Sequence, residues 1–550
     1  MLTAISKHVW RARKKLPIAS LALAAAMTLA APATADDLDP AERRAVEIYQ
    51  LLNENRAAEP DQIDTQLIGS WRVRDAPYQR NFRWVVSLSI GSLSYCVGSL
   101  IDPEWVLTSG VCASVLAPGF FDAVVGSRTL STATRRIDIA GFVVHPDFVM
   151  PNISGAQNLD GWYVANDIAL VKLATPINDL PIASPATPAQ AGRVQPGWTL
   201  GALGWGTTTD FSDDPNASGS DDLRQVRMRV WPQRRCVNFY DGVGNATQPI
   251  LDDMMCAGLR RGGRGTCNGD AGGPFTMRMQ GNPVVVGVAN WPIFGCGLAR
   301  IPPTFTRVGN HYDWIQQVLG GDFNCNSPDI ATLAPIRELD FECHTVPGLG
   351  SGTGLIPIGF PVRVGDTIAA SLEVTTEGHL VPLPFPPYPI DMVTPSPLNT
   401  MPFPVLAPFW TDINVLGEGF RPVNYGQTMI DGKRAFVVNW QRVGFHGQAV
   451  LDQARNAFQL IITESSLNSG NVQVEINYGQ IQFDSPDGGT NVARAGFVLI
   501  PGDPANTVEL VGSGVSGDLV DGGPNALTSN SNVGVNGRYV WDIVGGRILN

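Results

Sequence analysis

The stretch WVVSLSIGSLSYCVGSLIDPEWVLTS, residues 84–109, decides the fold class, because its short apolar runs are separated by residues that favour turns. The runs WVVSLSI (84–90) and EWVLTS (104–109) both have the length of a strand, and IALVKL (168–173) repeats the pattern. Such runs continue from Leu67 to about Gly320. This part of the chain is therefore expected to form an antiparallel barrel or sandwich.

The composition and the rest of the chain also indicate β structure. With 550 residues, 16% of them charged, and with 59 Gly and 42 Pro, the composition favours two or three turn-rich β domains. Strands are predicted at RAFVVNW (434–440) and FQLIIT (458–463), and in the alternating apolar residues from Val472 to Tyr478. HYDWIQQVLG (311–320) has apolar spacing typical of a helix that ends at Gly320, where we expect the first domain to end.

The N-terminus has the pattern of an export signal. Residues 1–35 contain basic residues, an apolar stretch and a small-residue Ala33-Thr34-Ala35 end, which predict a signal peptide and a secreted protein. A membrane anchor is the alternative reading, and no later segment is long enough to span a bilayer. Residues 36–66 are interpreted as a pro-segment with one short amphipathic helix.

Charge and cysteine content narrow the class of partner. Without the signal peptide the chain has 33 basic and 50 acidic residues, a net charge of −17, which argues against nucleic acid and anionic membranes. Eight cysteines in an exported chain favour four disulfides over zinc, because no Cys-x-x-Cys occurs. The acidic loop 210–223 has enough carboxylates for Ca²⁺, but its spacing favours a solvated loop. No metal or cofactor is expected.

Serial motifs resemble the chymotrypsin/trypsin family of serine proteases over about 250 residues. They occur in family order: CVGSLI (96–101), WVLTSGVC (105–112), NDIALVKL (166–173), LGWG (203–206), MCAG (255–258), CNGDAGGP (267–274) and VANWPIFGCG (288–297). The resemblance implies two antiparallel β-barrels over 67–320, a cleft between them and a closing helix. It also implies the disulfides Cys96–Cys112, Cys236–Cys256 and Cys267–Cys296, and leaves Cys325 to pair with Cys343.

The same resemblance implies a catalytic triad at Val111, Asp167 and Ala271. Valine stands where the family has its histidine, and alanine where it has its serine, so the general base and the nucleophile are both absent. The amides of Gly269 and Ala271 would still form the oxyanion hole. His145 is expected on the surface and His311 near the terminal helix, so neither replaces the base.

The substrate cleft and the activation site also depart from the family pattern. The specificity pocket is assigned to Gly265, Asn290, Trp291, Pro292 and Pro303, where the prolines remove amide donors and glycine replaces trypsin's acidic residue. The segment 67–70 matches the family's new N-terminus, and no Lys or Arg immediately precedes it to encode a trypsin-type cut. Asp270 is either that terminus's partner or a buried structural acid.

Beyond a disulfide-containing linker (321–354), residues 355–550 resemble the NIDO module, an extracellular domain named from nidogen. The resemblance rests on LAPFWTDIN (406–414), FVVNWQRVGF (436–445) and INYGQIQF (476–483). Its aromatic residues are interpreted as core and not as a ligand cage: Phe409, Trp410, Trp440 and Phe458. The family implies attachment to an extracellular or cell-surface protein or to matrix.

Two functions follow. The first is a secreted serine-protease homologue without catalysis that acts by extracellular binding or adhesion, and therefore is not an enzyme. The second is a serine-type endopeptidase that uses an unrecognised nucleophile. A decoy for protease inhibitors is a further reading, which Pro292 and Pro303 disfavour because they narrow the cleft. The residues at positions 111 and 271 separate the first two readings.

Overall fold

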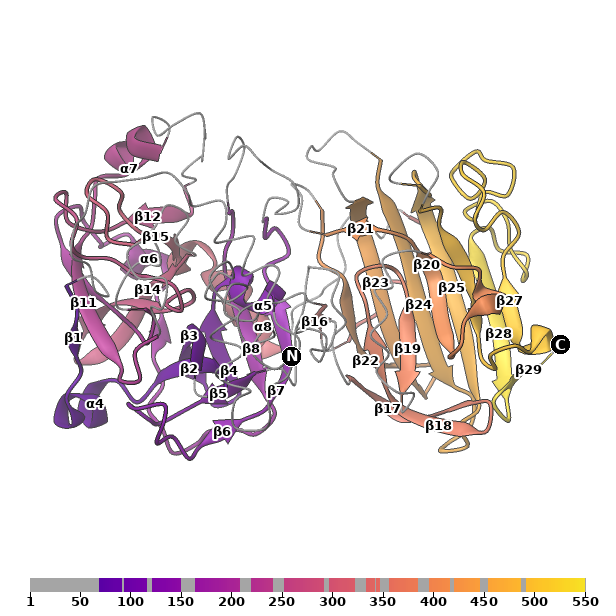
Figure 1. Cartoon of the computed structure of the whole chain (residues 1–550), viewed down its shortest axis with the longest axis horizontal. Helices are drawn as coiled ribbons and strands as arrows, with labels where there is room; N and C mark the ends of the chain where they lie inside the picture. The colour runs from indigo at the N-terminus through magenta and orange to yellow at the C-terminus, as the bar shows by residue number, and fades with distance from the viewer. Residues whose placement is uncertain are drawn as a thin grey trace, which may run out of the picture.

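In a computed structural model, two pairs of β-sheets follow one another along the chain (Figure 1). The structure describes residues 69–91, 93–115, 121–149, 164–207, 219–240, 252–290, 296–321, 333–341, 343–346, 356–383, 395–415, 420–445, 454–485 and 491–549. The predicted signal peptide and N-terminal helix lie outside these ranges. Strands dominate the described chain, which confirms the predicted all-β class.

The first sheet has seven antiparallel strands in the order β6-β5-β2-β3-β4-β8-β7. Its strands are β2 (Val85–Ile90), β3 (Leu93–Asp102), β4 (Trp105–Thr108), β5 (Asp122–Val124), β6 (Arg136–Ile137), β7 (Ile139–Val144) and β8 (Ala169–Leu173). Strands β2, β4 and β8 lie within the apolar runs that the sequence predicts as strands. All four residues of β4 are buried because it lies between β3 and β8.

The second sheet has eight strands, seven of them in the order β1-β11-β10-β13-β14-β15-β12, while β9 pairs with β14. They are β1 (Trp71–Arg72), β9 (Ser184–Pro185), β10 (Thr199–Gly204), β11 (Arg224–Arg229), β12 (Met254–Cys256), β13 (Pro274–Met279), β14 (Asn282–Ala289) and β15 (Thr304–Arg307). Along β11, Val226 and Met228 are buried in the core while Arg227 and Arg229 are exposed, as expected for the two faces of a strand.

Short helices connect the strands of these two sheets. They are α4 (Asp75–Asn81), α5 (Gly110–Val115), α6 (Pro188–Ala191), α7 (Gln233–Tyr240) and α8 (Tyr312–Gly320), with the 3₁₀ turn η2 (Val308–Asn310). Helix α8 confirms the helix predicted from residue spacing, and it buries Trp314, Ile315 and Val318. It ends at Gly321, whose φ of 74° is the left-handed conformation that glycine adopts at low cost.

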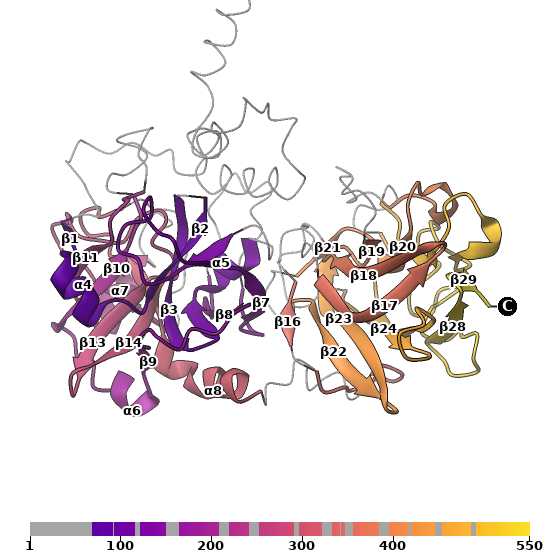
Figure 2. The ribbon, with the colours of Figure 1, turned by 90° about the horizontal axis from the view of Figure 1, so that it is seen from below.

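The C-terminal part contains two further sheets, which Figure 2 shows as two layers. One has β16 (His344–Thr345), β21 (Ile413–Asn414), β22 (Asn424–Ile430), β23 (Lys433–Phe445), β24 (Asn456–Glu464), β25 (Val472–Ile481), β28 (Arg538–Val544) and β29 (Arg547–Ile548). The other has β17 (Ile356–Val364), β18 (Thr367–Val374), β19 (Leu380–Leu383), β20 (Val405–Trp410), β26 (Arg494–Val498) and β27 (Thr507–Glu509). Leu406 of one sheet and Ile462 of the other line the same small apolar cavity between the layers.

Strands β23, β24 and β25 confirm the three strands predicted for this part of the chain. The four aromatic residues interpreted as core are at most 1% exposed. Trp440 and Phe458, on neighbouring strands, stack with ring centroids 4.9 Å apart. Their burial confirms the core interpretation.

Strand β16 joins the two halves of the molecule. It pairs with β22 of the C-terminal sheet and also packs against β7 of the first sheet, where the Val144 N–H donates to Thr345 Oγ1 at 3.2 Å. Arg421 and Asp147 add an ion pair of 2.8 Å between the halves. The predicted linker 321–354 therefore contains a strand of the C-terminal sheet, while the domain boundaries themselves stay a prediction.

Candidate functional site

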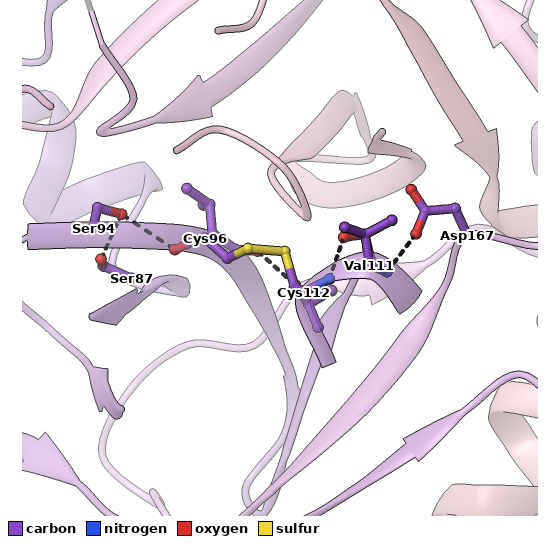
Figure 3. Close-up of a disulfide and its surroundings, with 9 residues drawn as sticks. Ser87, Ser94, Cys96, Val111, Cys112 and Asp167 are labelled. Carbon is purple, nitrogen blue, oxygen red and sulfur yellow. Dashed lines mark hydrogen bonds between the residues drawn. A yellow bond between two sulfur atoms is a disulfide. The ribbon is translucent and has the colours of Figure 1, made fainter. Parts of the chain in front are cut away.

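Val111 is placed by the turn from β4 into α5 and by the Cys96–Cys112 disulfide. Its side chain is buried, at 2% exposed, and its N–H donates to Asp167 Oδ1 at 2.8 Å (Figure 3). Gly110 beside it leaves room for Phe148, whose ring would lie 2.6 Å from a Cβ at that position. Two of the three predicted triad positions are therefore adjacent, joined through a backbone amide.

Asp167 is a fully buried carboxylate with few partners. It accepts backbone hydrogen bonds from Val111 and Gly110, and among the described residues its Oδ2 has no hydrogen-bond partner. Burial raises the pKa of Asp167 to about 7, because the apolar surroundings disfavour the charged form more than these two amides can offset, and the nearby negative charge of Asp253 raises it further. A buried acid without a cationic partner costs stability whenever it is ionised.

We expect Asp167→Asn to stabilise the folded protein at pH 8. Between about pH 4 and pH 7 the unfolded chain releases this proton while the folded protein keeps it, so the free energy of unfolding falls as pH rises through that window and stays low above it. Asparagine does not ionise, so the gain at pH 8 is on the order of 2–4 kcal/mol. Urea denaturation at pH 4 and pH 8 measures it.

Asp138→Asn is the matched control, because Asp138 is exposed and its replacement should change stability by less than about 0.5 kcal/mol. An Asp167→Asn protein less stable than the parent at pH 8 would contradict the assignment of a strained, ionised carboxylate.

The loop 267–273 carries the third predicted triad position, Ala271. The Cys267–Cys296 disulfide holds one end, and the Ala271 carbonyl accepts from the Val97 N–H at 2.8 Å. Gly272 lies so close to β4 that a Cβ there would be 2.1 Å from Thr108 Oγ1. The structure therefore brings this loop beside the segment that leads to Val111.

Asp270 is 1% exposed, and its two carboxylate oxygens accept from the Gly206 and Cys267 amides at 2.9 Å. Burial raises the pKa of Asp270 to about 7 despite these bonds. These contacts are those of a buried, hydrogen-bonded structural acid. The residues predicted as its alternative partner, at 67–68, lie outside the described chain.

The two amides predicted for the oxyanion hole remain available. Among the described residues, neither the Gly269 nor the Ala271 N–H donates a hydrogen bond, and Gly269 has a φ of 86° that few other residues adopt. Unpaired backbone donors at a tight turn form a site for an oxyanion. The alanine methyl beside them supplies no atom that attacks a carbonyl.

Part of the predicted specificity pocket is brought together. A Cβ on Gly265 would lie 3.2 Å from the Gly297 amide and 3.6 Å from the Pro303 ring, so these three residues are close together, while the pocket itself stays a prediction. Asn290 is 5% exposed and accepts from Thr306 Oγ1 at 3.1 Å, which turns its side chain oxygen into the sheet. Trp291 and Pro292 lie outside the described residues.

His145 is half-buried, and not fully exposed as a surface residue would be. Its ring packs 4.8 Å from His311 and 5.0 Å from Trp314, beneath the junction with the C-terminal half. Burial lowers the pKa of His145 to about 3, with the nearby His311 and Arg421 adding to the effect. Within the described chain, neither histidine hydrogen-bonds to Asp167 or Ala271.

A chain of buried hydroxyls beside Cys96 was not predicted. Ser87 Oγ lies 2.7 Å from both Ser89 Oγ and Ser94 Oγ, and Ser94 donates to the Cys96 carbonyl (Figure 3). Its signal in the sequence is the alternation of serine with apolar residues in WVVSLSI. Each of these partners is another hydroxyl or a carbonyl, so these contacts supply no base to activate a serine.

The described disulfides are Cys96–Cys112, Cys236–Cys256 and Cys267–Cys296, the pairs that the resemblance implies. Cys343 is also disulfide-bonded, while Cys325 lies outside the described chain. In the predicted acidic loop, Asp222 pairs with Arg128 and Arg72, and Asp221 accepts from Ser131, so both carboxylates already have partners. Residues 208–218 of that loop are not described.

Within the parts of the chain that the structure describes, no helix is long and apolar enough to cross a membrane. The same parts hold no group of three or more His, Cys, Asp or Glu side chains arranged to hold a metal ion.

The two barrel-like sheets and these disulfides are typical of a protein of the trypsin type. The trypsin family model matches residues 72–315, and the model of the nidogen-like domain matches residues 419–545. The chain is 30% identical over 240 residues to "Inactive snake venom serine proteinase 13" of Crotalus adamanteus, covering 43% of this chain and 81% of that one. It is 29% identical over 249 residues to "Tryptase" of Mus musculus, covering 44% and 85%. The chain therefore belongs to the trypsin family and carries a C-terminal nidogen-like domain, a domain of extracellular-matrix type.

Proposed function

We propose that this protein is an exported, non-catalytic member of the trypsin family that acts by binding outside the cell. The observation that carries the proposal is the pair of side chains Val111 and Ala271 at the base and nucleophile positions. An isopropyl group accepts no proton and a methyl group attacks no carbonyl, so the remaining Asp167 and the oxyanion amides have no chemistry to assist.

Several features support the proposal. Among the described residues, the Asp167 carboxylate contacts the backbone of residue 111 and no imidazole, and burial raises its pKa. One similar relative carries the word inactive in its name. The nidogen-like domain and the disulfides both suit an extracellular setting.

The proposed organisation is a signal peptide (1–35), a pro-segment (36–66), a trypsin-like domain (67–320), a linker (321–354) and a nidogen-like domain (355–550). Its partner on this view is an extracellular protein, a cell surface or matrix. Because β16 lies within the proposed linker, that linker is at least partly ordered.

We expect the purified protein to remain unlabelled by a fluorophosphonate probe and to cleave no peptide of a broad substrate set. Losing serine or histidine alone costs about a millionfold in rate in a well-studied serine protease, so losing both leaves no useful hydrolysis. Labelling beside active trypsin, at equal protein concentration, measures this. Stoichiometric labelling, mapped to one residue, would instead establish the alternative, an endopeptidase with an unrecognised nucleophile.

A further inference from the structure

Arginines gather on one surface of the second barrel, on strand β11 and on the loop that ends next to Gly265. We call this surface the arginine patch, and it consists of Arg227, Arg229, Arg260, Arg261, Arg264 and Arg300. All but Arg264 are exposed, and Arg264 is half-buried. Strand β11, which carries the first two, lies at the end of the molecule away from the C-terminal sheets in both views (Figures 1 and 2).

Backbone contacts hold the three segments of the patch together. The Gly258 N–H donates to the Arg229 carbonyl at 3.0 Å, and Arg264 Nη1 donates to the Arg227 carbonyl at 3.2 Å, so the loop that begins at Gly258 runs along β11. The Arg300 N–H donates to the Arg260 carbonyl at 3.1 Å and adds the third segment. The arginines are therefore neighbours in a fixed arrangement, although more than 70 residues separate the first from the last.

The patch lacks compensating charge. Among the described residues, none of the six arginines forms an ion pair with a carboxylate. The stretch from Leu223 to Arg307 contains eleven arginines, no lysine and four aspartates, in a chain whose formal net charge is −12. The net charge of the whole chain therefore conceals a local excess of positive charge on this surface.

One exposed tryptophan contacts an arginine of the patch, and a second lies on the segment that neighbours the end of β11. Trp71 is 41% exposed, pairs with Gln225 of β11, and lies under the Arg227 guanidinium at 5.9 Å. Trp198 is 45% exposed, and its carbonyl accepts from the Val230 N–H, next to Arg229. Tryptophan and arginine are enriched at binding surfaces, because both residues offer a large contact area and directed polar groups.

The arrangement suits repeated charges along an extended ligand. Arg227 and Arg229 point to the same side of β11, about 7 Å apart along the strand, and do not converge on one point as a site for a single small anion would. Guanidinium groups bind sulfate and carboxylate oxygens in a bidentate manner. The apolar ring faces of Trp71 and Trp198 suit sugar rings, whose edges offer C–H groups and hydroxyls.

We propose that the arginine patch binds an acidic polysaccharide, a chain of sugars that carries sulfate or carboxylate groups. This names a partner class for the binding role proposed above. A polysaccharide fits better than a nucleic acid because the nidogen-like domain is of extracellular-matrix type and because the acidic remainder of the protein repels the denser charge of nucleic acid.

The test compares binding of the full-length mature protein to heparin, which carries sulfate, and to polygalacturonate, which carries carboxylate alone. Neutral dextran and an oligothymidylate of similar length are the comparison ligands, and calorimetry or tryptophan fluorescence gives Kd. The variant R227Q/R229Q/R260Q removes three charges from the patch. The matched control R74Q/R80Q/R193Q removes three exposed arginines elsewhere.

We expect heparin or polygalacturonate to bind, the patch variant to bind about tenfold or more weakly, and the control to stay within about twofold of the parent. Binding of heparin alone would identify sulfate as the recognised group. Binding of both heparin and polygalacturonate would show that the patch accepts sulfate and carboxylate alike. No binding to either, equal losses in both variants, or tighter binding of oligothymidylate would overturn the proposal. A protein that a fluorophosphonate labels but that still binds heparin would contradict only the non-catalytic function.

Discussion

The double variant Val111→His, Ala271→Ser should react with a fluorophosphonate probe at least about a thousandfold faster than Ala271→Ser alone. The reason lies in Asp167, whose Oδ2 has no hydrogen-bond partner among the described residues and is free to accept an imidazole N–H. The Gly269 and Ala271 amides are available for the oxyanion. The probe is small, so the Pro303 ring near Gly265 is not expected to prevent its entry.

The control Val111→Gln, Ala271→Ser has a side chain of similar size at position 111 but no general base, and it should remain as slow as the single variant. Rates are measured by gel fluorescence over time on protein with its disulfides intact. Each variant is prepared both as the full mature chain and with Leu67 as the first residue, in case the family's terminal ammonium completes the site. A folded double variant that stays silent in both forms would refute the triad assignment.

Trp440→Ala should lower the free energy of unfolding of the nidogen-like domain by about 3–5 kcal/mol. Trp440 is fully buried, stacks on Phe458 with an angle of 12° between the rings, and donates from Nε1 to the Thr376 carbonyl at 3.1 Å. Alanine leaves a cavity between the two sheets and removes the buried partner of that carbonyl, and both changes favour unfolding.

Guanidinium denaturation followed by far-UV circular dichroism measures the loss. The matched control is Met429→Ala on the adjacent strand β22, where the side chain is 59% exposed and truncation should change stability by less than about 0.5 kcal/mol. A loss below about 1 kcal/mol for Trp440→Ala would show that this ring does not anchor the sheet packing.

The sequence was sufficient for most of the fold because the relevant signals are local. Alternating apolar runs place β2, β4, β8 and β23 to β25, and the spacing around Ile315 places α8 up to its terminal glycine. The motif WVLTSGVC contains Val111 beside Cys112, and the motif CNGDAGGP contains Ala271 close to Cys267. Each motif identified the position of its residue.

What the sequence did not predict depends on contacts between distant segments. The burial of His145 needs α8, more than 160 residues later in the chain, and the pKa of Asp167 depends on an environment assembled from several elements. The arginine patch had a local signal in RMR (227–229), where arginine occupies alternate positions. This signal is lost when the charges are summed over the whole chain.

Strand β16 has a mechanical consequence. Because one short strand is hydrogen-bonded into the C-terminal sheet and also bonded to β7, the chain between the halves does not act as a loose tether. We therefore expect the molecule to act as a spacer of nearly constant length, with a charged surface at one end and the nidogen-like domain at the other (Figure 1). If both ends bind sites in the same extracellular network, the spacing of those sites, and not only the affinity of each contact, determines whether both ends can bind at the same time.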